Sequence, residues 1–135
     1  GDHRDLHKEY RRQRQMCIRD RNMLLSGKDA TNRADATRVA KYTVDILKET
    51  VPCAVPGIAF LSGGQEDQES IDNLNEINLY AKNKNSPWEL TYSYGRGLQA
   101  APLKIWSGNK SNVLDAQNEF EKRGMSASKA RQGNY

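Results

Sequence analysis

Cysteine, histidine, proline and aromatic residues are all scarce in this 135-residue chain. Its two cysteines, Cys17 and Cys53, lie in unrelated contexts, so they form neither a disulfide framework nor a paired zinc motif, and we expect reduced thiols. His3 and His7 have no further ligand nearby, which favours solvated side chains over a metal site. No run approaches the roughly 20 apolar residues of a membrane-spanning helix, and no apolar segment follows the amino terminus. We therefore expect one cytoplasmic domain with no membrane partner, no metal and no cofactor.

The net charge of +4 comes from one short stretch. Arg11–Arg21 contains five arginines and one aspartate, and the basic and acidic residues of the rest of the chain balance. No global attraction to a polyanion follows from this distribution. A basic arm that binds nucleic acid is an alternative interpretation of the stretch. We disfavour it because few aromatic residues accompany the arginines, and we expect no nucleic-acid partner.

Two units of strand, glycine loop and helix follow each other in the central part of the chain. In order, they are an apolar strand at Ile58–Leu61, the loop Ser62–Gly64, a helix over about Glu66–Ala81, a strand at Trp88–Tyr94 and a loop at Gly95. Phe60 and Tyr92 are 32 residues apart, about the length of one βαβ repeat. The pattern predicts an α/β fold with a parallel sheet, whose first strand is buried on both faces.

Helical periodicity predicts three further helices. One runs from Asn32 to about Glu49, one contains Pro102 and is therefore kinked or starts late, and one runs from Ser111 or Asn112 to Gly124. The tail after Gly124 is expected to be irregular. The residues predicted to face inward are Ala36, Val39, Ala40, Thr43, Ile46 and Leu47 in the first helix, Ile71, Leu74 and Ile77 in the Glu66–Ala81 helix, and Val113, Leu114, Gln117 and Phe120 in the last.

The two glycine loops contain residue types that bind phosphate. Ser62, Gly63 and Gly64 can present unobstructed backbone amides directly before a helix amino terminus. Gly95 and Arg96 occupy the same place after the next strand, and a guanidinium matches the geometry of phosphate oxygens. A simple tight turn is the alternative for one such loop. Because the pattern occurs twice, an anion site at the carboxyl ends of parallel strands is as good an interpretation as two tight turns.

Several long motifs in the region from about Asn22 to Tyr135 resemble a known family. The motifs are Val51–Gln65, Trp88–Gln99, Leu103–Trp106 and Gln132–Tyr135. They resemble the carboxyl-terminal part of class I fructose-bisphosphate aldolase. The resemblance implies that the chain is an incomplete portion of a (β/α)8 TIM barrel. It also implies descent from a glycolytic lyase, a homotetramer without a cofactor, which reversibly cleaves fructose 1,6-bisphosphate to dihydroxyacetone phosphate and glyceraldehyde 3-phosphate.

The resemblance assigns six residues to the substrate phosphate site, and it assigns no catalytic residue to this chain. The six residues are Ser62, Gly63, Gly64, Ser93, Gly95 and Arg96. Asn22–Met23 resembles the end of the family's Leu-Leu-Lys-Pro-Asn-Met segment, whose lysine forms the Schiff base with the substrate. Arg21 cannot replace this lysine, because a guanidinium does not lose a proton to attack a carbonyl. We expect an inactive fragment, with a non-catalytic aldolase-like binding module as the alternative.

Residues 10–21 have no counterpart in the family, and we interpret them as an artefactual insertion. Codons for Gln15–Arg21 can spell a transposase adapter used in sequencing, and source codons that differ from the adapter would contradict this hypothesis. Residues 1–9 then represent an earlier strand end, residues 22–124 the last βα units and terminal helix, and residues 125–135 the start of the carboxyl-terminal tail. Two strands of a barrel leave open edges, so we expect marginal stability and aggregation.

Overall fold

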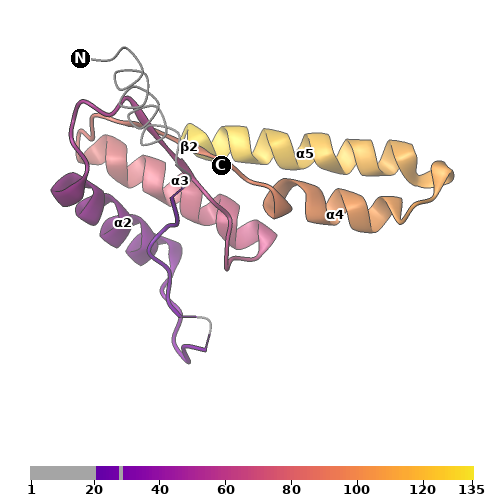
Figure 1. The fold of residues 1–135 in the computed structure, drawn as a ribbon, viewed down its shortest axis with the longest axis horizontal. Helices are drawn as coiled ribbons and strands as arrows, with labels where there is room; N and C mark the ends of the chain where they lie inside the picture. The colour runs from indigo at the N-terminus through magenta and orange to yellow at the C-terminus, as the bar shows by residue number, and fades with distance from the viewer. Residues whose placement is uncertain (1–20, 28) are drawn as a thin grey trace, which may run out of the picture.

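The computed structural model describes residues 21–27 and 29–135, so the expectations for His3, His7, Cys17 and residues 1–20 lie outside it. The elements are α2 (Ala36–Thr50), β1 (Gly57–Phe60), α3 (Asp67–Asn83), β2 (Glu89–Tyr92), α4 (Arg96–Trp106), the short 3-10 helix η1 (Lys110–Asn112) and α5 (Val113–Arg131) (Figure 1). No helix in this part of the chain is long and apolar enough to span a bilayer.

The two strands form the parallel sheet that the sequence predicts. Gly57 pairs with Glu89 and Phe60 pairs with Tyr92, so the residues that mark the 32-residue repeat lie side by side. Helix α3 connects the strands, which confirms the βαβ unit. The carboxyl ends of β1 and β2 therefore lie at one edge of the sheet, and the two glycine loops leave from that edge.

Arg21 extends the sheet on the other side of β1. Its backbone N–H donates to the carbonyl oxygen of Ala59 at 2.8 Å, and its own carbonyl oxygen accepts from the N–H of Leu61 at 2.8 Å. The bridge between Arg21 and Phe60 is parallel. Arg21 thus pairs with β1 as a residue of a third parallel strand would.

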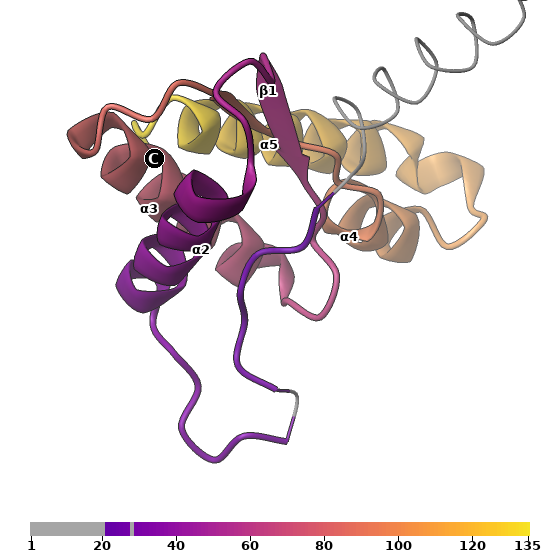
Figure 2. The ribbon, with the colours of Figure 1, turned by 60° about the vertical axis from the view of Figure 1, so that its left-hand side comes forward.

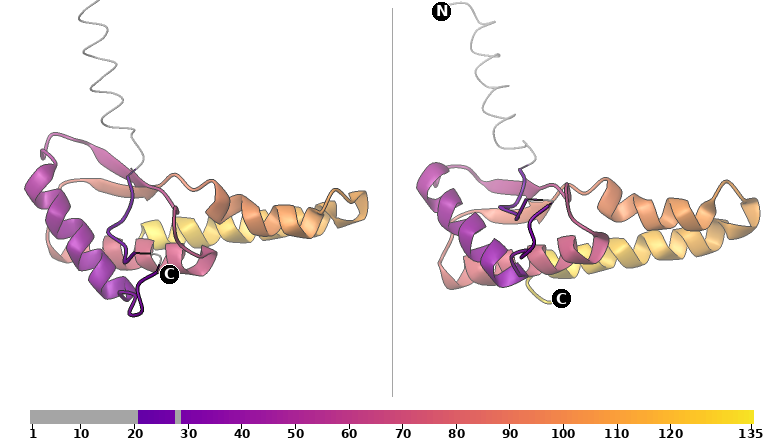
Figure 3. Two further views of the ribbon diagram at one scale, coloured as in Figure 1. Left: turned by 60° about the horizontal axis from the view of Figure 1, so that its bottom comes forward. Right: turned by 90° about the horizontal axis from the view of Figure 1, so that it is seen from below.

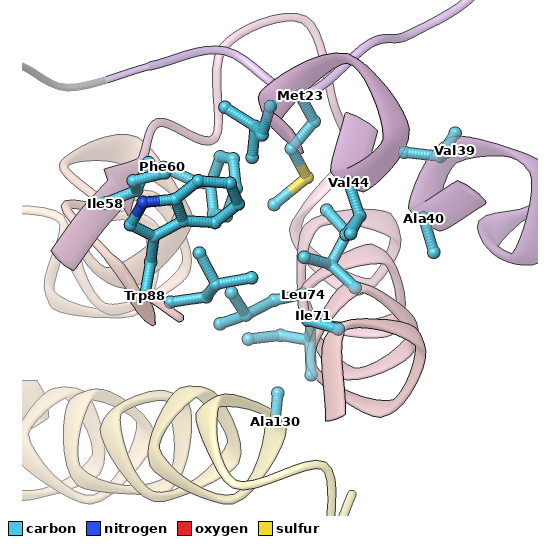
Figure 4. Close-up of a cluster of buried hydrophobic side chains, with 14 of the residues drawn as sticks. Met23, Val39, Ala40, Val44, Ile58, Phe60, Ile71, Leu74, Trp88 and Ala130 are labelled. Atoms are coloured by element: carbon cyan, nitrogen blue, oxygen red, sulfur yellow. The ribbon is translucent and has the colours of Figure 1, made fainter. Parts of the chain in front are cut away.

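The core lies between the sheet and the helices on one side of it. In Figure 3, α2, α3 and α5 lie on the same side of the two strands, and the core side chains meet there (Figure 4). Ile71, Leu74 and Ile77 of α3 are fully buried, as predicted. The strand prediction was wrong in one respect, because Gly57 and Ala59 are only half-buried while Ile58 and Phe60 are buried. The helices cover the face that carries Ile58 and Phe60, since both side chains belong to one buried cluster with residues of α2, α3 and α5. Figure 2 shows β1 and these helices from another side.

Helix α2 begins later than predicted. The Asp35 side chain accepts a hydrogen bond from the N–H of Arg38 at 2.9 Å, so Asp35 rather than Asn32 caps the helix. The predicted inward face is mostly correct, but Ile46 is 41% exposed and Val44 is buried in its place. Helical periodicity alone is compatible with an inward position for either Val44 or Ile46. The position of α3 against α2 decides that Val44 is the buried one.

Helix α5 differs most from the prediction. It continues through Gly124 to Arg131, because Ala127 and Ala130 are fully buried against the core and hold this end of the helix. The predicted inward residues Leu114 and Phe120 are 72% and 48% exposed, Gln117 is exposed and Val113 is half-buried. The amino-terminal half of α5 packs beside α4 in a hairpin that projects away from the sheet (Figure 3). The hairpin leaves that half without a core to face.

Helix α4 begins at Arg96, so the late start that Pro102 suggested is wrong. Pro102 is buried inside the helix, which continues past it to Trp106. Proline cannot donate a backbone hydrogen bond to the preceding turn. The helix nevertheless forms, since it packs against α5.

Tyr94 joins the end of the sheet to α3 through a buried hydroxyl. Its ring packs on that of Tyr92, with ring centroids 5.4 Å apart. Its hydroxyl donates to the carbonyl oxygen of Ser70 at 2.7 Å. Burial raises the pKa of the Tyr94 phenol above its ordinary value of 10.

Tyr94→Phe is expected to destabilise the chain by about 1 kcal/mol at neutral pH through the lost hydrogen bond. Because the pKa of Tyr94 is raised in the folded state, its favourable contribution is complete below pH 10 and declines as the pH rises above 10. The free energy of unfolding of the wild type should therefore fall more steeply above pH 10 than that of the variant. Urea unfolding at pH 7 and pH 11, followed by circular dichroism, measures both. Parallel pH profiles for the two proteins would contradict this account.

Candidate phosphate site

The two glycine loops touch each other at the carboxyl edge of the sheet. The N–H of Ser93, just beyond β2, donates to the carbonyl oxygen of Phe60 at 2.8 Å. A Cβ atom built on Gly97, in the first turn of α4, would lie 3.2 Å from both Cβ and Oγ of Ser62. Glycine at position 97 therefore lets the start of α4 approach the loop after β1. The strand pairing and this close approach bring the two loops into one site.

A cavity of about 560 Å³ opens where the loops meet. Three of the six predicted site residues line it: Ser62, Gly64 and Arg96. The other lining residues are Leu25, Ser26, Arg33, Gln65, Glu66, Asp67, Gly97 and Ala100. A volume of this size is typical of sites for small organic ligands.

Gly63, Ser93 and Gly95 do not line the cavity but support its walls. A Cβ atom on Gly63 would lie 3.4 Å from Oδ1 of Asn22, so this glycine permits the contact between the first loop and the segment after Arg21. Ser93 continues the pairing of the sheet. The Gly95 carbonyl oxygen accepts from the N–H groups of Leu98 and Gln99 at 3.2 and 3.1 Å, which starts α4.

Backbone donors are concentrated around the cavity. Gly64 has φ +78°, a left-handed conformation that favours glycine, and it forms the turn in which the N–H of Gln65 donates to the carbonyl oxygen of Ser62. In residues 21–27 and 29–135, the N–H groups of Gly63 and Gly64 have no backbone acceptor. The first N–H groups of α4, at Arg96 and Gly97, cannot be satisfied within the helix. These amides and the α4 dipole favour an anion.

The charged side chains of the cavity have both signs. Arg96 lies at the first position of α4, and Arg33 reaches the cavity from the segment before α2. Glu66 and Asp67 line the same cavity at the start of α3. Within the described residues, no group of three or more His, Cys, Asp or Glu side chains is arranged to hold a metal ion. The lining of the cavity therefore combines two guanidinium groups and several amides with two carboxylates.

Sequence reasoning missed Gly97 and Arg33 for different reasons. Gly97 directly follows Arg96, and its position at a helix entry was a local signal. Arg33 is about 30 residues before the first glycine loop in sequence, and no spacing rule connects it to the loop. Only the packing of the segment before α2 on that loop places Arg33 beside Gly64.

A family model described as "Fructose-bisphosphate aldolase class-I" matches residues 14–135. The chain is 46% identical over 114 residues to "Fructose-bisphosphate aldolase 4, cytosolic" of Arabidopsis thaliana, which covers 84% of this chain and 28% of that protein. Human "Fructose-bisphosphate aldolase B" is 45% identical over the same length, 84% of this chain and 31% of the human protein. The chain thus spans about a third of the length of these relatives.

A solved structure of similar fold supports the same relationship. The fructose-bisphosphate aldolase of Plasmodium falciparum, crystallised in complex with TRAP and a small-molecule inhibitor, superimposes with a TM-score of 0.79 and 43% sequence identity. The superposition covers 84% of this chain and 32% of the Plasmodium chain. The αβ unit described above is therefore similar to part of a larger known fold.

Proposed function

Because this chain belongs to the class I fructose-bisphosphate aldolase family, we propose that its cavity binds a phosphate group of a phosphorylated sugar. Fructose 1,6-bisphosphate and its product dihydroxyacetone phosphate are the ligands that the family implies. The family's fold is the TIM barrel, and this chain is a partial α/β unit of it. The observation that carries the proposal is the contact between the two glycine loops, where Ser62 meets Gly97 and Arg96 opens onto the same cavity.

Each group in the site has a distinct part in binding the phosphate. The N–H group of Gly64 and the amino terminus of α4 donate to phosphate oxygens, while Gly63 supports the loop behind them. The Ser62 hydroxyl supplies one further donor from the cavity wall. The Arg96 guanidinium provides a full positive charge and two parallel donors. Together they orient the phosphorylated end of a sugar at the carboxyl edge of the sheet.

The chain is proposed to bind its ligand without cleaving it. Cleavage in the family proceeds through a lysine Schiff base, and the motif that carries this lysine is represented here only by Asn22–Met23. For the parent enzyme we propose a cytosolic homotetramer, in keeping with the cytosolic Arabidopsis relative. No observation on the described residues favours the alternative of nucleic-acid binding.

Arg96→Gln is expected to weaken the binding of inorganic phosphate about tenfold, because it removes a charge-assisted hydrogen bond. A titration of the 135-residue chain with phosphate, at constant ionic strength and followed by amide NMR, measures the affinity. The N–H signals of Gly64 and Gly97, which line the cavity, are expected to shift most.

Arg38→Gln is the matched control for this experiment. Arg38 is exposed on α2 and does not line the cavity, so the substitution changes the net charge by the same amount without touching the site. Its phosphate affinity should stay within about twofold of the wild type. Equal losses in both variants would indicate nonspecific charge attraction and would contradict the proposed site.

A further inference from the structure

Arg33 holds the first glycine loop from outside the sheet. Its Nη2 atom lies 2.8 Å from Oε1 of Glu69 and donates to the carbonyl oxygen of Gly64 at 3.4 Å. The side chains of Arg33 and Glu69 are 38% and 28% exposed, so water screens this ion pair only in part. One guanidinium therefore contacts both the loop and the helix that follows it.

Glu69 connects Arg33 to the start of α3. While its Oε1 pairs with Arg33, its Oε2 accepts a hydrogen bond from the N–H of Glu66 at 3.1 Å. The contacts run from the Glu66 backbone through Glu69 and Arg33 to the Gly64 carbonyl. They enclose the short segment Gly64–Glu66, the part of the loop that contributes consecutive residues to the cavity wall.

The same segment carries an excess of negative charge for a phosphate site. Glu66 and Asp67 line the cavity, and Glu69 lies in the same first turn of α3. Carboxylates at a helix amino terminus stabilise the helix, but they repel a second anion there. The ion pair with Arg33 compensates the charge of Glu69. The contact of Arg33 with the Gly64 carbonyl also pairs a backbone acceptor of the first glycine loop.

We propose that Arg33 is a positioning residue for the phosphate cavity, which fixes the Gly64 carbonyl and neutralises Glu69 so that the glycine loop accepts an anion. The proposal rests on the phosphate-binding function proposed above. It adds a residue from a third segment of the chain to a site that the two strand ends define. Arg33 acts through Gly64 and Glu69, whereas Arg96 is the arginine that meets the phosphate.

The test is a double-substitution cycle on the full 135-residue chain, with inorganic phosphate as the probe in the amide NMR titration. Arg33→Gln is expected to weaken phosphate binding about three- to fivefold, as fits a partly exposed ion pair. Arg33→Lys, which keeps the charge, should lose less. Glu69→Gln removes the negative charge but retains an oxygen for the N–H of Glu66. The double variant Arg33→Gln/Glu69→Gln should therefore return to within about twofold of the wild type.

Recovery in the double variant separates positioning from a merely structural role. If Arg33 only braced the loop, Glu69→Gln would weaken it further, and the double variant would bind less phosphate than Arg33→Gln alone; that result would overturn the proposal. If Arg33→Gln loses the dispersed NMR spectrum of the wild type, Arg33→Lys takes its place in the cycle. The phosphate affinities of the wild type and Arg33→Lys, each with and without Glu69→Gln, then decide between positioning and a merely structural role.

The outcomes also distinguish this proposal from the one on which it rests. A wild-type chain whose signals do not respond to phosphate overturns both. The role of Arg33 alone is overturned by a second pattern. In it the wild type binds phosphate, Arg96→Gln binds it weakly and Arg33→Gln binds it as the wild type does. Arg38→Gln again controls for the change in net charge.

Discussion

Dihydroxyacetone phosphate is expected to leave no stoichiometric covalent adduct on this chain when the mixture is reduced with borohydride. Borohydride converts a Schiff base into a stable secondary amine, so an active lysine would be trapped with the ligand. In the family motif Leu-Leu-Lys-Pro-Asn-Met, the lysine lies two residues before the asparagine. Counting back from Asn22 places Asp20 at that position, and a carboxylate cannot form an imine. Intact-mass spectrometry before and after reduction measures the adduct.

A full-length class I aldolase that contains the complete motif is the positive control. Each of its chains should gain the mass of one ligand, less the water lost when the imine forms and plus the two hydrogens added on reduction. Competition with inorganic phosphate separates specific capture of the ligand from slow reaction of surface lysines. Inorganic phosphate suppresses only an adduct that forms at the phosphate site. A stoichiometric adduct on one lysine of this chain, suppressed by phosphate, would contradict the prediction. It would also show that another lysine has taken over the role of nucleophile.

The local signals in the sequence predicted the central βαβ unit well. The apolar run at β1, the Ile71, Leu74 and Ile77 stripe of α3 and the 32-residue repeat all depend on neighbours along the chain, and the structure confirms them. The Gly124 stop signal failed because a glycine costs a helix only about 1 kcal/mol. Burial of Ala127 and Ala130 outweighs that cost. The missed part of the fold thus depends on tertiary contacts.

The candidate site divides in the same way. Ser62, Gly64 and Arg96 were predictable, because each follows a recognisable strand at its carboxyl end, and the structure places all three on one cavity. Arg33 was not predictable, since its place in the site depends on how the segment before α2 folds back onto Gly64 and Glu69. The hydropathy pattern of the sequence cannot indicate a polar contact between such distant segments. The marginal stability and the insertion at residues 10–21 stay predictions.

Phe60→Ala is expected to abolish the tertiary structure of the isolated chain. Phe60 is fully buried at the carboxyl end of β1, next to its strand partner Tyr92 and within the cluster that α3 completes. Truncation of a buried phenylalanine to alanine costs about 3–5 kcal/mol through lost burial and the cavity left behind. Such a loss equals or exceeds the stability that a partial barrel can be expected to have. Near-UV circular dichroism of the buried Trp88 and the dispersion of the amide NMR spectrum report the change.

Leu114→Ala is the matched control for Phe60→Ala. Leu114 is 72% exposed on the projecting half of α5, so its truncation should change the free energy of unfolding by less than about 0.5 kcal/mol. A Phe60→Ala chain that keeps the near-UV signal of the wild type would contradict the core described here. Equal losses in the free energy of unfolding for Phe60→Ala and Leu114→Ala would also contradict this core, because only Phe60 is buried. A large loss at Phe60 alone would tie the stability of the sheet edge, and with it the phosphate cavity, to the burial of this side chain in the core cluster.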